Sequence, residues 1–255
     1  MHDDNSINNN DLEVIEGKNA VAEALKGGRP INKIMLSRNI QSHSLVAEIL
    51  HLARSSGIPF EYVDRVALAR HTVSNAHQGI IALASAKEYL TLDELLAISK
   101  IKAEPPLYLV LDGIEDPQNL GAILRTADAA GIHGVILRAR RAAGLTSSVA
   151  RASAGAIEYV PVARVVNIAQ ALEELKKNGL WVTGIDMVGE VDYARADYQS
   201  PTAIVIGSEG KGLSPLIRKR CDVLAFIPMK GKIASLNASV AAALVMYQAM
   251  RQRAT

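Results

Sequence analysis

Residues 227–253 read IPMKGKIASLNASVAAALVMYQAMRQR, and this stretch decides how the second half of the chain folds. It begins at an apolar strand end and continues into a loop with three hydrogen-bonding side chains, Ser235, Asn237 and Ser239. Apolar residues then recur at helical spacing, at Val240, Leu244, Tyr247 and Met250. Polar groups between a strand end and a helix N-terminus commonly form a ligand pocket in α/β proteins. The stretch therefore predicts such a pocket, followed by a final Ala-rich helix over 238–249.

The rest of 107–255 alternates between apolar strands and amphipathic helices. Strands are expected at 107–113, 134–138, 159–162, 180–187, 202–207 and 222–228. Helices are expected at 119–130, 147–155 and 167–179, with a short one opening at Ser214. The first strand, LYLVLDG, is a near-continuous apolar run of the kind that is buried in a parallel sheet. The pattern therefore predicts a mostly parallel sheet with helices on both faces.

The first half of the chain contains a smaller alternating series. Residues 1–11 are polar and Asn-rich, which is typical of a disordered tail. Residues 12–86 combine strands at 31–37, 58–63 and 79–85 with helices at 19–25, 42–57 and 65–72, and form a compact α/β domain. Residues 87–106, which contain a weak helix and end in two prolines, are interpreted as a linker to the domain at 107–255.

Composition narrows the class of protein. The chain has 255 residues, a formal charge of +2 and 49% hydrophobic residues, which is ordinary for an α/β protein and permits an RNA partner without requiring one. The single cysteine, Cys221, excludes an internal disulfide and a multi-cysteine metal site, and is interpreted as a packing residue. No apolar run reaches the length of a membrane span, about 18 residues, and the N-terminus lacks a signal-peptide pattern, so a cytoplasmic protein is expected.

Two further stretches contain residues typical of functional sites. The glycine-rich GSEGKG (207–212) follows a strand, but its spacing fits neither the dinucleotide-binding nor the Walker A pattern. Three glycines around Glu209 would instead let the backbone approach a ligand closely. In DGIEDPQNLGAILRTADAAG (112–131), Asp116 and Pro117 predict a helix start, and Arg125 lies beside the apolar stripe. An arginine at that position suits a phosphate, although an exposed polar face explains it equally well.

Together, DxxxDPxNLGAxxRTADAAG, IGSEGxGLS and IPMxGxxxSLNxSVAxAL resemble motifs 1, 2 and 3 of the SpoU/TrmH family of the SPOUT superfamily. Residues 12–86, including HQGIIA (77–82), resemble the ribosomal-protein-like substrate-binding domain of many members. The segment 147–165 resembles the bacterial 23S rRNA guanosine 2′-O-methyltransferase branch. The resemblance implies an α/β catalytic domain with a deep trefoil knot, working as a homodimer with its active site near the subunit interface.

The resemblance also implies a cofactor and a set of site residues. S-adenosylmethionine would bind in the knot against Gly207, Ile227, Met229 and Leu236. The catalytic set would be Arg125, Asn119, Glu209, Ser235 and Asn237. A guanidinium has a pKa too high for a general base, so Arg125 is expected to bind phosphate and stabilise the developing alkoxide. Glu209 is expected to orient Arg125 or Asn119. RNA contacts in the first domain are expected at Lys18, Arg38, Arg70 and His77.

The expected partners are therefore RNA, most specifically 23S rRNA, and a second copy of the chain, with no metal and no membrane. Two alternatives remain open. The same reaction on tRNA fits the motifs, although the tRNA-type relatives generally use short basic extensions in place of a small N-terminal domain. A catalytically silent RNA-binding or ribosome-assembly factor would also fit the fold. Such a protein could lose any residue of the catalytic set, and the presence of all five residues speaks against it.

Overall fold

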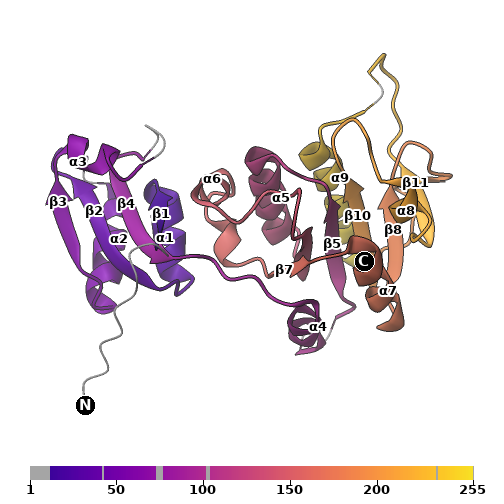
Figure 1. Ribbon diagram of the computed structural model, residues 1–255, viewed down its shortest axis with the longest axis horizontal. Coiled ribbons are helices and arrows are strands. Elements are labelled where there is room, and N and C mark those ends of the chain that lie inside the picture. Colours follow the sequence, from indigo (N-terminus) through magenta and orange to yellow (C-terminus); the bar gives the residue numbers. More distant parts are fainter. Residues whose placement is uncertain (1–11, 42, 73–76, 102–103, 234, 255) are drawn as a thin grey trace. The chain divides into compact units, whose positions relative to one another are not determined.

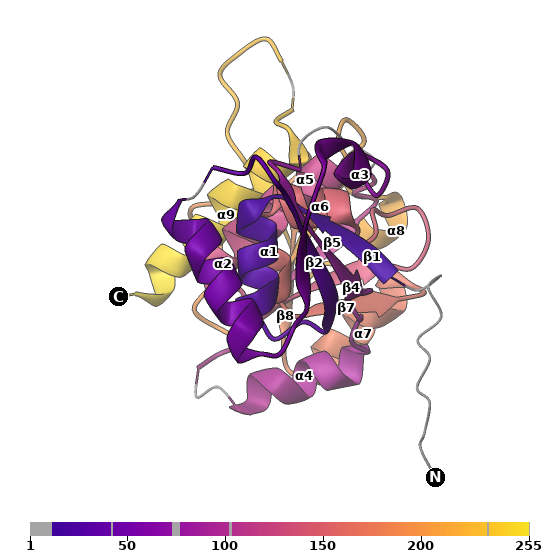
Figure 2. The same cartoon turned by 90° about the vertical axis from the view of Figure 1, so that its left-hand side faces the viewer.

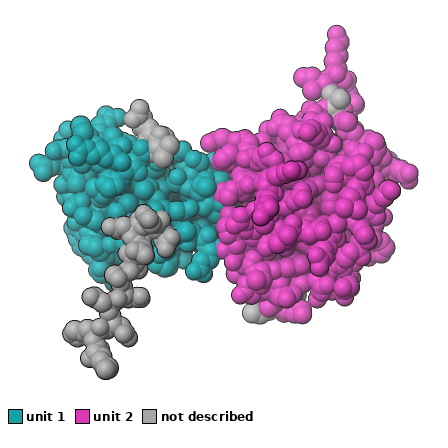
Figure 3. Space-filling view, viewed as in Figure 1, with its two compact units in different colours: residues 1–88, 145–159 teal, residues 89–144, 160–255 magenta. Residues whose placement is uncertain are grey.

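The computed structural model describes residues 12–41, 43–72, 77–101, 104–233 and 235–254. The chain divides into two compact units (Figure 3). Unit 1 contains residues 12–88 together with 145–159, and unit 2 contains residues 89–144 and 160–254. The segment 145–159, which the sequence pattern places inside the second domain, thus packs with the first. The tail predicted at 1–11 lies outside the described residues.

Unit 1 is built on a four-stranded sheet with the order β1-β4-β2-β3. Its elements are β1 (Leu12–Glu16), α1 (Lys18–Lys26), β2 (Ile31–Ser37), α2 (Ser44–Ser55), β3 (Phe60–Val63), α3 (Arg65–Ala69), β4 (Ile80–Ser85), α6 (Ser147–Ala152) and the 3-10 turn η2 (Ala156–Glu158). Strand β4 is antiparallel to both β1 and β2, whereas β3 is parallel to β2. The predicted α/β pattern of this region is present, and its first strand, β1, was not predicted.

Alternating side chains of β2 divide the core of unit 1 between the two faces of the sheet. Ile34 and Leu36 are fully buried in a cluster with residues of α1 and α2, helices that lie side by side (Figure 2). Met35 faces the other way and packs with Leu68 of α3 and Ile81 of β4. Helices therefore cover both faces of this small sheet.

Unit 2 contains a seven-stranded sheet with the order β7-β6-β5-β10-β8-β11-β9, in which every pairing is parallel (Figure 1). Its elements are α4 (Leu92–Ile101), β5 (Leu107–Asp112), α5 (Pro117–Ala129), β6 (Gly134–Arg138), β7 (Val162–Val165), α7 (Ile168–Lys177), β8 (Trp181–Ile185), β9 (Val191–Asp192), β10 (Thr202–Gly207), α8 (Pro215–Arg218), β11 (Val223–Phe226) and α9 (Ala238–Arg253). The strands' carboxyl ends meet at one edge, where ligands bind in open α/β sheets.

Both faces of the large sheet are buried, as its apolar strands predict. Tyr108 and Val110 of β5 pack in a cluster with Leu95 of α4 and Leu172 of α7. Leu109, which alternates with them, is fully buried on the opposite side. The central strands therefore form the two-sided core of a parallel sheet.

The strand predicted at 159–162 is wrong. Residues 156–158 form η2, and the strand begins only at Val162, where the backbone pairs in register with Val135 of β6. Gly155, in a left-handed conformation with φ 93°, starts the 3-10 turn. Pro161 has no N–H to donate to a sheet ladder, and only its carbonyl is used, by the N–H of Val135. The turn and the proline together delay the strand by three residues.

Candidate functional site

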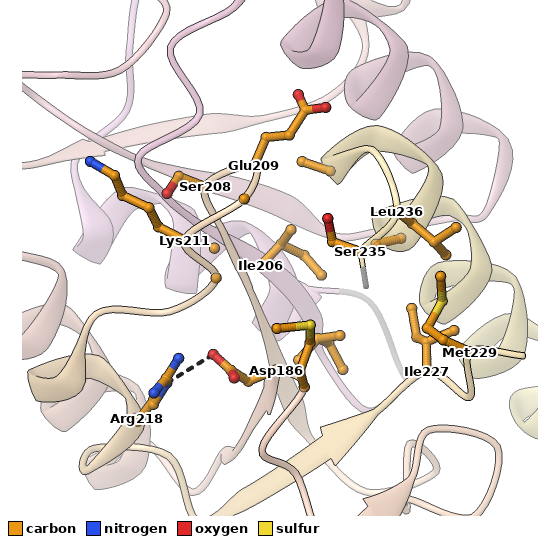
Figure 4. A pocket seen from close by; sticks show the side chains of 17 residues that line it. Asp186, Ile206, Ser208, Glu209, Lys211, Arg218, Ile227, Met229, Ser235 and Leu236 are labelled. Carbon is orange, nitrogen blue, oxygen red and sulfur yellow. Dashed lines mark hydrogen bonds and ion pairs between the residues drawn. The ribbon is translucent and has the colours of Figure 1, made fainter. Parts of the chain in front are cut away.

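The carboxyl ends of β8, β10 and β11 surround a cavity (Figure 4). Its walls come from the end of β8, the turn 207–212, the segment after β11 and the start of α9. The lining is largely apolar, with Ile185, Met187, Ile206, Ile227, Met229, Leu236, Ala238 and Ala241. Polar lining comes from Asp186, Ser208, Glu209, Lys211, Arg218 and Ser235, and from the glycine backbone at 207, 210 and 212. All four residues expected to hold the cofactor, Gly207, Ile227, Met229 and Leu236, line this cavity.

The turn 207–212 forms one wall of the cavity and is closed on itself. The N–H of Gly212 donates to the carbonyl of Ser208 at 3.0 Å, and Gly210 and Gly212 both have left-handed φ values, 77° and 63°. A Cβ built on Gly207 would lie 2.2 Å from the carbonyl carbon of Gly212. Only glycine fits at position 207, because any side chain would push the two backbone segments apart. The turn thus brings glycine backbone to the cavity at close range, between the side chains of Ser208, Glu209 and Lys211.

Asp186, directly after β8, holds this turn in place and was not predicted from the sequence. Its side chain is 1% exposed and its Oδ2 accepts hydrogen bonds from the Leu213 N–H at 3.0 Å and the Arg218 Nε at 2.9 Å. Its Oδ1 accepts from the Val188 N–H at 3.2 Å. The buried carboxylate is therefore paired and hydrogen-bonded, as a buried charge requires. The signal available in the sequence was an aspartate at the carboxyl end of a strand.

A second cavity adjoins the first and shares Ser208, Glu209, Lys211 and Ala238 with it. The rest of its lining comes from the loop after β5 and the start of α5, namely Gly113, Ile114, Glu115, Asp116 and Asn119. As predicted, α5 begins at Asp116, whose carboxylate accepts from the N–H groups of Gln118 and Asn119. The cap places Asn119 in the first turn of α5, where it faces the shared wall.

Three side chains from three distant parts of the chain meet at the shared wall. Asn237 donates through Nδ2 to Oδ1 of Asn119 at 2.9 Å and to Oε2 of Glu209 at 3.5 Å. Asn119 also donates to Oε2 of Glu209 at 3.4 Å. The Asn237 Oδ1 is used separately, as the cap of α9, accepting from the Ser239 N–H at 2.9 Å. The orientations of both side-chain amides are therefore fixed. Glu209 was expected to orient Arg125 or Asn119, and in the structure it contacts Asn119.

Arg125 is not among the residues that line either cavity. It lies on α5, two turns beyond Asn119, and is exposed. Within the described part of the chain, no hydrogen bond or ion pair involves its guanidinium. The structure thus brings together Asn119, Glu209, Ser235 and Asn237 around the two cavities, but it leaves Arg125 facing solvent.

In unit 1, two of the four predicted RNA contacts line one polar cavity. Lys18 and His77 lie there with Ser37, Asn39, Ile40, Gln41, Arg65, Gln78 and Gly79. The His77 side chain is buried and its Nδ1 accepts from the Gly79 N–H at 3.0 Å, so its Nε2 is the nitrogen that carries the proton in the neutral ring. Arg38 is exposed and 3.6 Å from Asp64, and Arg70 is exposed at the end of α3.

Three other expectations concern Cys221, a metal site and a membrane span. Burial raises the pKa of the Cys221 thiol to about 12, and its Sγ donates to the carbonyl of Ile217, so this thiol stays protonated and serves packing. Among the residues that the structure describes, no group of three His, Cys, Asp or Glu side chains is placed to hold a metal ion. The described helices also include none long and apolar enough to cross a membrane.

Comparison with known proteins identifies the family. Residues 106–247 match the SpoU rRNA Methylase family, and residues 14–90 match the family described as RNA 2′-O ribose methyltransferase substrate binding. YacO of Bacillus subtilis, a protein assigned to the TrmH family of tRNA and rRNA methyltransferases, is 47% identical over 94% of this chain and 96% of its own length.

Among the solved structures that resemble nearly the whole chain are two with AdoMet bound. The SpoU methyltransferase AviRb from Streptomyces viridochromogenes, in complex with AdoMet, has a TM-score of 0.79 at 27% identity, covering 96% of this chain and 92% of its own. An AdoMet-bound rRNA methyltransferase from Sinorhizobium meliloti has a TM-score of 0.78 at 27% identity, covering 95% and 88%. The family match and the close relative together decide the assignment. The chain belongs to the SpoU rRNA methylase family and is an RNA 2′-O-ribose methyltransferase.

Proposed function

We propose that this protein transfers a methyl group from S-adenosylmethionine to the ribose 2′-hydroxyl of a guanosine in 23S rRNA, in the cytoplasm and as a homodimer. The observation that carries the proposal is the wall shared by the two cavities. One cavity is apolar with a glycine turn, the other is polar, and Asn119, Glu209 and Asn237 are hydrogen-bonded to one another between them. A methyl donor and a ribose could therefore lie on either side of one polar contact point.

The first cavity fits S-adenosylmethionine, the cofactor of the family. Ile206, Ile227 and Leu236 offer apolar surface to a purine, and the turn 207–212 offers backbone at close range. Asp186 and Arg218 are already paired with each other, so they shape the cavity and leave recognition to the backbone and to Ser235. When bound, this cofactor supplies a methyl group on a positively charged sulfur, which makes the methyl electrophilic.

The chain's own residues then have three tasks at the ribose. Asn119 and Asn237, fixed by their mutual hydrogen bond, hold the 2′-hydroxyl in position for in-line attack. Glu209 orients both amides through its Oε2. We assign Arg125, which faces solvent and lines neither cavity, to an RNA phosphate. With RNA bound, its guanidinium would stabilise the negative charge that develops as the hydroxyl loses its proton, since a guanidinium is a poor base.

The choice of rRNA over tRNA rests on unit 1. This unit supplies a complete second fold in addition to the catalytic one, and it contains a polar cavity lined by Lys18 and His77. We assign these two residues, together with the exposed Arg38 and Arg70, to RNA contacts outside the reacting nucleotide. An additional recognition domain suits a structured rRNA target, and the segment 147–165 resembles the 23S rRNA guanosine branch. Methylation of tRNA is the alternative.

The deep trefoil knot is also part of this proposal. It is supported by family membership and by the fact that Ile227, Met229 and Leu236 line the same cavity as the turn 207–212, although α8 and β11 separate the two along the chain. The site would then be built from two stretches of backbone that pass one another.

Two measurements test the proposed function. Calorimetry with S-adenosylmethionine should show one binding site per chain, and the absence of binding at millimolar ligand would contradict the enzyme assignment. Mapping of 2′-O-methyl groups on RNA from cells with and without the protein should show one guanosine of 23S rRNA that loses its methyl group. Loss of a methyl group from a tRNA instead would select the alternative substrate.

A further inference from the structure

Three arginines lie at the end of β6 and directly after it, in the segment RARRAAG (138–144), and no part of the proposed mechanism uses them. Arg138, Arg140 and Arg141 are all exposed. Within the described part of the chain none of them forms an ion pair or a side-chain hydrogen bond, whereas the exposed Arg220, for example, is paired with Glu173 at 2.9 Å. Like charges gathered within four residues repel one another, and an anionic partner would relieve that repulsion.

The backbone of this segment is ordered by specific contacts. The N–H of Ala139 donates to the carbonyl of Val165 at 2.8 Å, and the carbonyl of Ala139 accepts from the Arg164 Nη2 at 2.7 Å. The N–H of Ala143 donates to the carbonyl of Ile114 at 2.8 Å. Arg141 has a left-handed φ of 56°, a conformation that a non-glycine residue adopts only at a cost in free energy. The arginines are therefore presented by a fixed loop, which lowers the entropy cost of binding.

The loop lies at the same edge of the sheet as the second cavity. Strand β6 is parallel to β5 with Leu137 opposite Leu111. Arg138, the last residue of β6, and the segment 139–144 after it therefore lie at the edge where the loop 113–116 follows β5. Ile114, which accepts the bond from Ala143, lines that cavity itself. Lys211 adds a further cation from the shared wall, and the exposed acids that line the same cavity are Glu115, Asp116 and Glu209.

We propose that Arg138, Arg140 and Arg141 bind the phosphates of the RNA strand next to the nucleotide that is methylated. This proposal rests on the proposed function, because it takes the second cavity as the ribose site. Guanidinium groups match phosphate oxygens in geometry and stay charged at any physiological pH. Phosphate contacts position a strand without reading its bases, so these arginines hold the RNA in place while the cavity selects the reacting ribose.

The test uses the full chain with Arg138→Gln, Arg140→Gln and Arg141→Gln combined. Methyl transfer to large-subunit rRNA should show a KM for RNA raised about tenfold or more, with kcat within about twofold, since these residues do not touch the reacting atoms. The slope of log kcat/KM against log salt should fall by about 2, because each phosphate that is no longer neutralised lowers it by about 0.7. Arg220→Gln, whose arginine is paired with Glu173, is the matched control and should leave both quantities unchanged.

The triple variant with lysine at the same three positions should have a KM for RNA between those of the wild type and the glutamine variant. Lysine keeps the positive charge but cannot donate two parallel hydrogen bonds to a phosphate as a guanidinium does. Unchanged S-adenosylmethionine binding in calorimetry establishes that each variant is folded. A glutamine variant with wild-type KM and wild-type salt slope would overturn the inference and leave the proposed function standing. If the wild type methylates no RNA, the proposed function fails, and equilibrium binding of an rRNA fragment, with the same expected change in salt slope, tests the arginines separately.

Discussion

Arg125 is a predicted catalytic residue that the structure places outside both cavities. It is exposed on α5 and lines neither cavity. Because of this position, we expect Arg125→Ala to leave the Kd for S-adenosylmethionine within about twofold. Because of its proposed role in stabilising the developing charge, we expect the same variant to lower kcat for methyl transfer by about 100-fold or more, the range for loss of one charge-stabilising donor. Single-turnover methylation and calorimetry measure the two quantities. A collapse of cofactor binding would show that Arg125 belongs to the cofactor site. Arg220→Ala, an exposed arginine paired with Glu173, is the control.

Most of the site could be predicted because its residues lie within short motifs. Asn119, Glu209 and Asn237 belong to three stretches with strong local patterns, and the structure joins them through hydrogen bonds. Asp186 could not be found in this way. Its function depends on β8 lying beside β10, so that its carboxylate meets the Leu213 N–H, and adjacency of strands is not written in any local pattern.

At the scale of elements, the strand–helix pattern placed the segment 145–159 in the domain 107–255, whereas the structure groups it with unit 1. A Cβ built on Gly155 would lie 2.4 Å from the Glu23 Cβ, so η2 begins in direct contact with α1. Arg151 donates to Glu16 of β1 at 2.8 Å. These contacts join residues more than 130 positions apart, and periodicity carries no information about such long-range ion pairs. The segment completes the fold of unit 1 although it is inserted between strands of unit 2.

Glu158 is the buried acid through which the segment 145–159 pairs with Arg29 and Lys87. Its side chain is 2% exposed and accepts from Arg29 Nη1 at 3.0 Å and Lys87 Nζ at 3.2 Å, and the Arg29 side chain is itself 3% exposed. Glu158→Gln leaves a buried guanidinium with only Glu13 as its acidic partner, so we expect a loss of about 3 kcal/mol in the stability of unit 1. Hydrogen exchange of the β4 amides should accelerate about 100-fold, while that of the β5 amides stays unchanged.

The matched control for this substitution is Glu174→Gln, which breaks an exposed pair with Lys177 and should change stability by less than about 1 kcal/mol. Equal acceleration in β4 and β5 would show that the two units unfold together and that Glu158 has no particular role in unit 1. An unchanged β4 would mean that 145–159 contributes little to the stability of that unit.

At the scale of the whole molecule, α9 has an apolar stripe that stays partly exposed among the residues that the structure describes. One face of the helix is buried through Ala242, Val245 and Ala249. On another face, Val240, Leu244 and Tyr247 are 47%, 38% and 43% exposed, at the i, i+4, i+7 spacing of one helix side. A two-fold dimer would pack this stripe against its own copy, since an isologous interface uses the same patch on both subunits. The stripe is the feature that favours the proposed homodimer.

We therefore expect the wild-type chain to sediment as a dimer and Val240→Asp combined with Leu244→Asp to sediment as a monomer. Each buried aliphatic side chain contributes about 1.5–3 kcal/mol, so the loss of two on each subunit, with charges in their place, weakens a dimer by more than about 1000-fold in Kd. Val166→Asp, at a loop position that is 85% exposed, is the matched control and should leave the dimer intact. Sedimentation equilibrium at micromolar protein measures the oligomeric state, and circular dichroism verifies folding. A monomeric wild type would contradict the homodimer, and a dimeric double variant would place its interface elsewhere. If methyl transfer also falls with dimer dissociation while S-adenosylmethionine binding by the monomer persists, the second subunit contributes to the RNA site and not to the cofactor cavity.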